Sequence, residues 1–322
     1  MLHRRSVIAA LSGFAFAPYA VCAQNYTGPV TLIVPFAAGG STDAIARIVA
    51  EAMRGPLGQT IIVENRGGAG GSLGTAAIAR AAPDGATIGM GTASTLAINP
   101  AAYVTLPYDV LADLAPIGAI AEVPNIMSIN PAVPARDMAS FIALAKEKPD
   151  GFSYGSSGNG SVSHLMGEQF KLATGTQMVH VPYRGVGPAL ADTVGGQIQV
   201  MFDNLPTSLP LVQAGKLRAL AVSAPHRLAV LPAVPTFAEL NLTELNWSAF
   251  FGLVAPAHTP QPVVARFNAA LNAALAQTTV RDLLAAQQAT VTPGSPAQFA
   301  GLIHREITRM KRATQAANIR IE

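Results

Sequence analysis

Short apolar runs alternate with helical patterns along the first third of the chain. A run typical of a buried strand, VTLIVP at 30–35, is followed by a helical pattern at 43–58. Strand patterns recur at 60–64 and 87–93, and a helical stretch at 72–81 lies between them. This β–α–β–α–β order predicts a parallel sheet with helices on both of its faces.

The same alternation returns in the middle of the chain and predicts a second sheet. Because each unit would form its own sheet, we predict an α/β protein of two lobes, each a mostly parallel sheet flanked by helices. The predicted strands are 125–130, 152–155, 178–183, 198–204 and 217–224, the predicted helices are 137–148, 161–175 and 187–196, and an aromatic strand at 247–256 precedes closing helices at 261–277 and 295–317.

Two stretches are candidates for strands that cross between the lobes. They are PIGAIAEVPNI, which ends at 126, and LRALAVSAP, which begins at 217. Two crossings imply a discontinuous first domain. We therefore predict that residues 24–123 and 223–322 form domain 1 and that residues 124–222 form domain 2.

The composition supports a folded protein and argues against nucleic-acid binding. Half of the 322 residues are hydrophobic and 12% are charged, so the chain can bury a large core. The formal net charge is +3, but Arg4 and Arg5 lie in a segment that we expect to be removed. That leaves 19 basic and 18 acidic residues, with no basic stripe of the kind that nucleic-acid binding requires.

Residues 1–23 have the three parts of a secretory signal peptide. A basic start, MLHRR, precedes an apolar stretch of about a dozen residues, too short for the roughly 20 that span a bilayer. Small residues in VCA predict cleavage after Ala23 and export of the mature chain. The alternatives are an ordinary N-terminal helix, lipidation at Cys22, or export by the twin-arginine route.

Cys22 is the only cysteine in the chain. Cleavage after Ala23 would leave a mature protein without any thiol. Disulfides, thiolate chemistry and cysteine-ligated metals are then excluded, and the histidines show no metal-binding spacing.

A glycine-rich loop joins the first strand to the first helix in VPFAAGGSTDAIA, residues 34–46. Backbone amides at a helix N-terminus form an anion site, and glycine allows close approach of a ligand. The loop has no basic residue before Arg47 and lacks both the phosphate-loop lysine and the GxGxxG pattern. These features favour a carboxylate over a phosphate. A tight turn with a helix cap, supplied by residues 41–43, is the structural alternative.

A second loop of the same type lies in the other predicted lobe. YGSSGNGSVSHL, residues 154–165, again joins a strand to a helix through glycines and hydroxyls, without Lys or Arg. Both loops are at carboxyl ends of strands, where α/β proteins bind ligands. Facing each other across a cleft between domains, the two loops would hold a carboxylate from both sides.

Five motifs together resemble one known family. They are VPFAAGGSTDAIAR, VENRGGAGGSLGTAAIARAAPDG, YGSSGNGSVSHL, VPYRGVGPALADTVGGQI and GKLRALAVSAPHR. The chain resembles the Bug-type periplasmic receptors of tripartite tricarboxylate transporters over nearly its whole mature length. The resemblance implies a Venus-flytrap fold of type II, a carboxylate held by backbone amides and water without a cofactor or metal, and delivery to an integral membrane permease.

The resemblance also implies the residues of the two jaws. Asp43 is expected to cap its helix or orient a water, because like charges repel. His164 is either a ligand donor or a packed, capping histidine. One jaw would contain Phe36, Ala37, Ala38, Gly39, Gly40, Ser41 and Asp43, the other Ser156, Ser157, Gly160, Ser161 and His164, and we add Ser94, which follows the strand at 87–93.

Asp203, at the end of the strand 198–204, is the last candidate ligand-binding residue. As a hypothesis, it receives an ammonium or hydroxyl group on the distal end of the ligand. A cap on the following helix is the alternative. The expected ligand is a small mono- or dicarboxylate, amino acids and aromatic acids included, and the expected receptor is a monomer.

A serine hydrolase is the enzymatic alternative. GFSYG at 151–155 matches the GxSxG of the nucleophile elbow. That elbow places its serine at a sharp strand-to-helix turn, whereas Ser153 falls inside a predicted strand and the next helix begins about eight residues later. We therefore expect a receptor rather than an enzyme.

Overall fold

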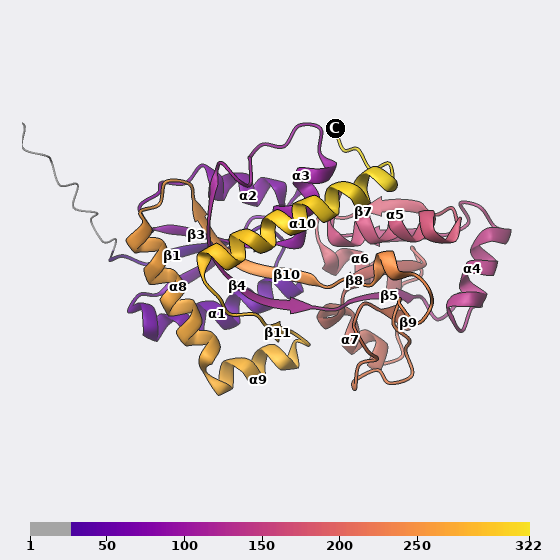
Figure 1. Ribbon diagram of the computed structural model, residues 1–322. Coiled ribbons are helices and arrows are strands. Elements are labelled where there is room, and N and C mark those ends of the chain that lie inside the picture. The colour runs from indigo at the N-terminus through magenta and orange to yellow at the C-terminus, as the bar shows by residue number, and fades with distance from the viewer. Residues whose placement is uncertain (1–26) are drawn as a thin grey trace, which may run out of the picture.

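The computed structural model describes residues 27–322 and has two lobes (Figure 1). The N-terminal and C-terminal parts of the chain share one lobe, and the middle of the chain forms the other. Each lobe has its own sheet with helices packed on it, which confirms the predicted α/β architecture. The predicted signal peptide and its cleavage site lie outside the described residues.

The first sheet combines strands from both ends of the chain in the order β11-β4-β10-β3-β1-β2. Strand β1 pairs in parallel with β2 and β3, whereas β10 pairs antiparallel with β3 and β4, and β11 pairs antiparallel with β4. The strands are β1 Val30–Val34, β2 Ile61–Asn65, β3 Thr87–Thr92, β4 Leu114–Val123, β10 Ala249–Pro256 and β11 Thr290–Val291.

The second sheet has the order β7-β6-β8-β5-β9. Strand β6 pairs in parallel with β7 and β8, and β5 pairs antiparallel with β8 and β9. The strands are β5 Asn125–Ile129, β6 Ser153–Ser156, β7 Val179–Pro182, β8 Val200–Asn204 and β9 Arg218–Val222.

Both sheets are mixed, so the prediction of mostly parallel sheets is wrong in this detail. The chain leaves the first lobe along β4 and enters the second along β5, with only Pro124 between them. Strands that return, β9 and β10, run opposite to these outgoing strands and pair with them antiparallel. The change of sheet at Pro124, and again between Val222 and Ala249, agrees with two crossings, while the exact domain boundaries stay a prediction.

Ten α-helices and three short helical segments connect the strands within residues 27–322. The sequence prediction missed α7, because Pro206 and Pro210 are helix breakers; Pro206 lies in the first turn, where a missing N–H group costs little. The helices are α1 Ser41–Leu57, α2 Ser72–Ala79, α3 Asn99–Ala102, α4 Met138–Glu147, α5 Val162–Thr174, α6 Val186–Val194, α7 Leu205–Gln213, α8 Gln261–Ala276, α9 Thr278–Ala286 and α10 Pro296–Ala316, and the short segments are η1 Ala69–Gly71, η2 Ser94–Ile98 and η3 Thr243–Leu245.

One large apolar core extends through both lobes. It includes the fully buried Ile45 and Met53 on the inner face of α1 and Phe141 and Phe170 on helices of the second lobe. Long helix α10 begins with a capping box between Ser295 and Gln298 and runs from the first lobe toward the second (Figure 1). The strands and helices that carry the loops at the carboxyl ends of the strands are therefore packed against one continuous core.

Candidate ligand-binding site

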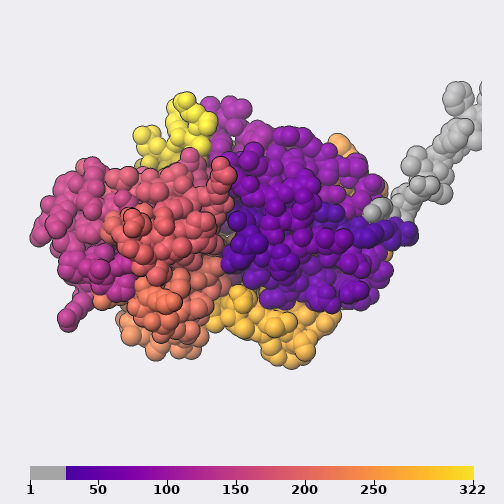
Figure 2. All heavy atoms as spheres, turned by 180° about the vertical axis from the view of Figure 1, so that it is seen from behind, coloured from indigo at the N-terminus to yellow at the C-terminus, as the bar shows by residue number. Residues whose placement is uncertain are grey.

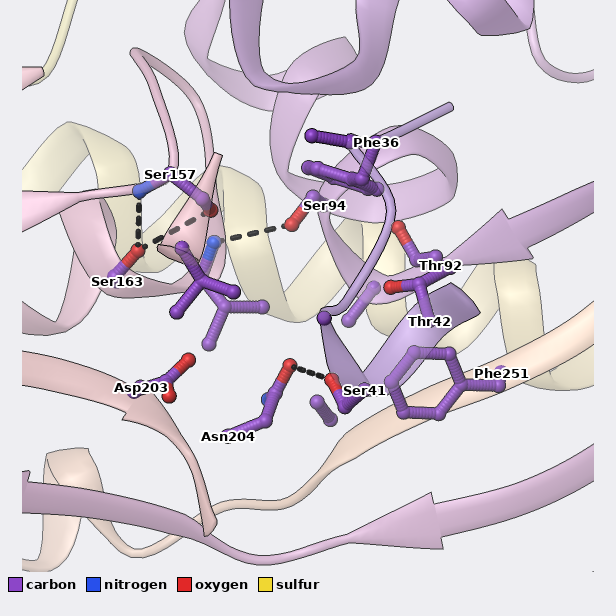
Figure 3. Close-up of a pocket in the computed structure, with 16 residues that line it drawn as sticks. Phe36, Ser41, Thr42, Thr92, Ser94, Ser157, Ser163, Asp203, Asn204 and Phe251 are labelled. Atoms are coloured by element: carbon purple, nitrogen blue, oxygen red, sulfur yellow. Dashed lines mark hydrogen bonds between the residues drawn. The ribbon is translucent and has the colours of Figure 1, made fainter. Parts of the chain in front are cut away.

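A small pocket of about 40 Å³ lies between the lobes. On the face shown in Figure 2, the surface of the N-terminal lobe meets that of the middle lobe along one line. Figure 3 shows the side chains that enclose the pocket. Its lining comes from the first lobe through Phe36, Ala37, Gly40, Ser41, Thr42, Thr92, Ala93, Ser94, Ala249 and Phe251, and from the second through Ser157, Val162, Ser163, Val186, Asp203 and Asn204.

Two helices in opposite lobes contribute residues of their first turn to this pocket, and neither helix has a side-chain cap. Helix α1 follows its N-cap Gly40, and α6 follows its N-cap Gly185, and neither end has a side-chain cap hydrogen bond. The first amides of a helix have no partner within the helix, and the helix dipole favours an anion there. Gly40 and Val186 also meet across the lobes, since a Cβ on Gly40 would lie 3.2 Å from Cγ1 of Val186.

Asp43 holds the first loop in shape, but it does not cap α1 in the expected way. Its carboxylate accepts hydrogen bonds from the amide of Gly39 at 3.1 Å, from Asn65 at 2.9 Å and from Arg47 at 3.1 Å. Although burial alone would raise it, the pKa of Asp43 is lowered by these hydrogen bonds from Arg47, Gly39 and Asn65. The carboxylate therefore stays ionised, and Asp43 is not among the residues that line the pocket.

A chain of side-chain hydrogen bonds links the pocket to the crossing between the lobes. The hydroxyl of Ser41 donates to Asn204 across the lobes at 3.0 Å, and Asn204 donates to Asn125 at 2.7 Å. Asn125 follows Pro124 at the crossing and donates to the carbonyl of Trp247 at 2.8 Å. The position of lobe 2 is thus coupled to the first turn of α1.

The second loop caps its own helix. Ser161 accepts a hydrogen bond from the amide of His164 at 3.3 Å and is fully buried. The amide of Gly160 donates to Nδ1 of His164 at 3.2 Å, and the hydroxyl of Ser156 lies 2.6 Å from Nε2 of His180. The two imidazole rings stack 4.1 Å apart, and burial lowers the pKa of His164 to about 4 and that of His180 to about 3. Both rings are therefore neutral at neutral pH, and they stabilise the loop through their contacts with Gly160 and Ser156.

Asp203 lies at the pocket and also contacts the helix that follows it. It lines the pocket at the end of β8, and its Oδ2 accepts hydrogen bonds from Thr207 at 2.5 Å and Ser208 at 3.0 Å in α7. Burial raises the pKa of Asp203 to about 7, against the hydrogen bonds from Thr207, Ser208 and the Asn204 amide, and no charged side chain contributes. Figure 3 shows the carboxylate directed toward the interior of the group of lining residues.

The structure brings half of the predicted site residues to the pocket. Direct contact of any of them with a ligand stays a prediction. The sequence prediction missed several lining residues, among them Thr42, Thr92, Ser163, Val186 and Asn204. Asn204 could have been predicted, because it directly follows Asp203 at the end of a strand. Phe36, Ala37, Gly40, Ser41, Ser94, Ser157 and Asp203 line the pocket, whereas Ala38, Gly39, Asp43, Ser156, Gly160, Ser161 and His164 shape its loops or lie behind them.

The serine of the GxSxG pattern is not arranged as a nucleophile. Ser153 opens strand β6, and α5 begins nine residues later, at Val162. No hydrogen bond joins the Ser153 hydroxyl to a histidine within residues 27–322. The same residues bring together no group of three His, Cys, Asp or Glu side chains that could hold a metal ion. The geometry gives no support to the hydrolase alternative.

Two α/β lobes joined by two crossings, with a pocket between them at the carboxyl ends of strands, define a two-lobed solute-binding protein of the periplasmic type. The family model described as "Tripartite tricarboxylate transporter family receptor" matches residues 45–319, and the chain belongs to this family. The family is one of receptors, and no helix within residues 27–322 is long and apolar enough to span a bilayer.

Relatives match this chain over nearly their whole length. Protein BugT of Bordetella pertussis is 38% identical over 291 residues, which cover 90% of this chain and 89% of BugT. The solved structure of R. palustris Rpa4515 with adipate is 35% identical, with a TM-score of 0.87, covering 91% of this chain and 98% of that one. MatC of Rhodopseudomonas palustris with bound malate is also 35% identical, with a TM-score of 0.85 and coverage of 88% and 98%. These likenesses confirm the resemblance drawn from the sequence motifs.

Proposed function

We propose that this protein binds a small carboxylate between its lobes and delivers it to a membrane permease. The observation that carries this proposal is a pair of helices without a side-chain cap, α1 after Gly40 and α6 after Gly185, whose first residues line one pocket from opposite lobes. The pocket lining contains no Lys, Arg or His. The malate and adipate bound by two relatives of the same family support a carboxylate as the ligand.

Backbone donors alone can supply the required affinity. A hydrogen bond to a charged group contributes about 1.5–3 kcal/mol. Three or four such bonds suffice for micromolar binding, which needs about 8 kcal/mol. Hydroxyl groups of Ser94 and Ser157 lie at the same pocket and can add donors or hold bridging water, whereas the proton of the Ser41 hydroxyl is already donated to Asn204.

Asp203 sets the chemistry of the distal end of the ligand in this proposal. It is the only charged residue of the lining, and its side-chain hydrogen bonds both end on Oδ2. An ammonium or hydroxyl group of the ligand can donate to this carboxylate, whereas a second ionised carboxylate would be repelled by it. A dicarboxylate would then bind best while Asp203 is protonated. Amino acids and hydroxy acids fit this end of the pocket best.

Export and assembly follow the same proposal. The chain would be exported, cleaved after Ala23 and active in the periplasm as a monomer. Ligand binding would shift a pre-existing equilibrium toward the closed lobes, and the closed form would be the one that the permease recognises.

A thermal-shift screen of organic acids on the chain produced from Gln24 tests the function. Malate, adipate, aspartate, glutamate and benzoate represent the classes of ligand that the proposal covers. At least one is expected to raise the melting temperature and to show micromolar affinity in calorimetry. An unchanged melting temperature with every carboxylate would contradict the proposed function.

A further inference from the structure

A second contact between the lobes lies outside the ligand pocket. Segment η1 and helix α3 of the first lobe meet the loop that precedes α5 in the second. The hydroxyl of Tyr103 lies 3.0 Å from the carbonyl oxygen of Ala69 and 3.1 Å from that of Asn159. One hydroxyl proton is thus shared between a carbonyl group of each lobe. None of these three residues lines the pocket.

Glycines allow the two backbones to meet at this contact. A Cβ on Gly70 would lie 2.0 Å from the carbonyl oxygen of Asn159, and a Cβ on Gly158 would lie 2.8 Å from the amide nitrogen of Gly70. A Cβ on Gly160 would lie 2.4 Å from Oδ1 of Asn99. Side chains cannot occupy these positions while the lobes are closed.

The first-lobe side of the contact is held in place before closure. Asn99 donates from Nδ2 to the carbonyl of Gly70 at 3.3 Å and to the hydroxyl of Tyr108, also at 3.3 Å. Tyr108 in turn donates to the carbonyl of Thr95 at 2.7 Å. These bonds lie within the first lobe, so that side of the contact does not depend on the second lobe for its shape.

We propose that Gly70, Tyr103, Gly158, Asn159 and Gly160 form a latch that stabilises the closed lobes and so raises ligand affinity without touching the ligand. We call it the rim latch. The inference rests on the proposed function, because closure around a ligand gives the latch its use. Rotation about the two crossings would separate Gly70 from Asn159. The apparent affinity rises with the fraction of molecules in the closed, binding-competent state. By raising that fraction, the rim latch would increase the affinity for any ligand that binds between the closed lobes.

Gly70→Ala is the sharpest test, because it blocks the closed contact, and Gly58→Ala is its matched control. Gly70 has φ +59° and Gly58 has φ +70°, so alanine meets similar backbone strain at both positions. Gly58 ends α1, far from the second lobe, and a Cβ on it would have no other atom within 4 Å. We expect the dissociation constant for malate to be roughly tenfold or more higher in Gly70→Ala than in Gly58→Ala.

Tyr103→Phe removes only the shared hydroxyl, and Tyr183→Phe is its control. The hydroxyl of Tyr183 donates to Asp192 at 2.7 Å within the second lobe. Tyr103→Phe is expected to raise the dissociation constant roughly two- to tenfold, the range of one lost hydrogen bond. Tyr183→Phe should leave the dissociation constant unchanged.

The distance between the lobes gives a readout that does not require ligand binding. The chain produced from Gln24 has no cysteine, so Glu51→Cys in α1 and Glu147→Cys in α4 can carry spin labels. Pulsed electron resonance would measure the label distance with no ligand and with malate. With or without malate, Gly70→Ala should show longer label distances than Gly58→Ala in at least one of the two conditions. Wild type should populate the shorter distance that corresponds to closed lobes.

Two results would overturn the rim latch. One is an identical distance distribution for Gly70→Ala and Gly58→Ala in both conditions. The other is a wild type that binds malate in calorimetry and yet stays open in both conditions. A protein that binds none of the acids fails the proposed function in the thermal-shift screen, and in that case the latch is judged by the distances measured without ligand.

Discussion

The two glycine-rich loops have similar sequences, but only the second one caps the helix that follows it. The loop before α1 leaves its helix without a side-chain cap, and Gly40 and Ser41 line the pocket. The loop before α5 caps its helix with Ser161 and rests on the stacked rings of His164 and His180. A helix N-terminus binds an anion only while its own side chains leave the amides open. The second lobe supplies its open N-terminus at α6 instead.

The comparison predicts that adding a cap to α1 will abolish ligand binding. Gly40→Asp places a carboxylate at the N-cap, where it accepts hydrogen bonds from the same amides and repels the ligand. We expect at least a hundredfold loss of affinity, equivalent to about 3 kcal/mol, and equal or higher thermal stability. Calorimetry and thermal unfolding measure both.

Gly40→Ala separates the effect of the cap from that of crowding. It adds the same Cβ, 3.2 Å from Val186, without an acceptor oxygen. An equal loss of affinity in Gly40→Ala and Gly40→Asp would show that contact with Val186, not competition for the amides, controls binding.

A smaller effect is expected at the distal end of the pocket. Asp203→Asn keeps the shape of the side chain but removes its charge, so amino-acid binding at pH 8 should weaken about tenfold, the loss of one charged hydrogen bond. In wild type, affinity for an amino acid should rise with pH through about 7, and affinity for a dicarboxylate should fall, because the pKa of buried Asp203 is raised to about 7. Calorimetric titrations at pH 6 and pH 8 measure how the affinity for each of the two ligands changes with pH.

The same substitution has a consequence for stability. A carboxyl group whose pKa is higher in the folded than in the unfolded state stabilises the protein at low pH, and this contribution is lost as pH rises. For Asp203 the loss should fall between about 4 and about 7, and Asp203→Asn should remove it. Identical pH profiles of stability and affinity in wild type and Asp203→Asn would exclude this role.

The smallest effect on binding is expected in the second loop. Ser161→Ala removes the cap of α5 and should lower the free energy of unfolding by about 1 kcal/mol. Ser161 does not line the pocket, so the dissociation constant should change less than twofold. Chemical denaturation measures the free energy of unfolding, and calorimetry on the same sample measures the dissociation constant. A large loss of affinity at unchanged stability would mean that the second loop, like the first, takes part in ligand binding.

Local patterns in the sequence predicted most elements and the position of the first loop. The run VTLIVP and the glycines after it specify a strand, a turn and a helix within a few residues, and β1 and α1 follow that order. Strand direction was harder, because the pairing of β10 with β4 joins segments more than a hundred residues apart. No local pattern reports which way a returning strand runs.

The pocket was predicted only in part for the same reason. Ser41 and Asp203 are at strand or helix ends that the sequence marks clearly, whereas Val186 reaches the pocket only because the lobes meet. The glycines of the second loop suggested a ligand, but Gly158 and Gly160 allow close contact with the first lobe instead. Sequence alone does not distinguish a glycine that admits a ligand from one that admits another segment of the chain.

The central claim is that amides at two uncapped helix N-termini hold the carboxylate from both lobes. Nuclear magnetic resonance of the ¹⁵N-labelled chain tests it directly during titration with the acid that gives the largest thermal shift. We predict that the amide signals of Ser41, Thr42 and Val186 move most and saturate together with binding. Saturable binding that leaves these three signals in place would contradict the claim.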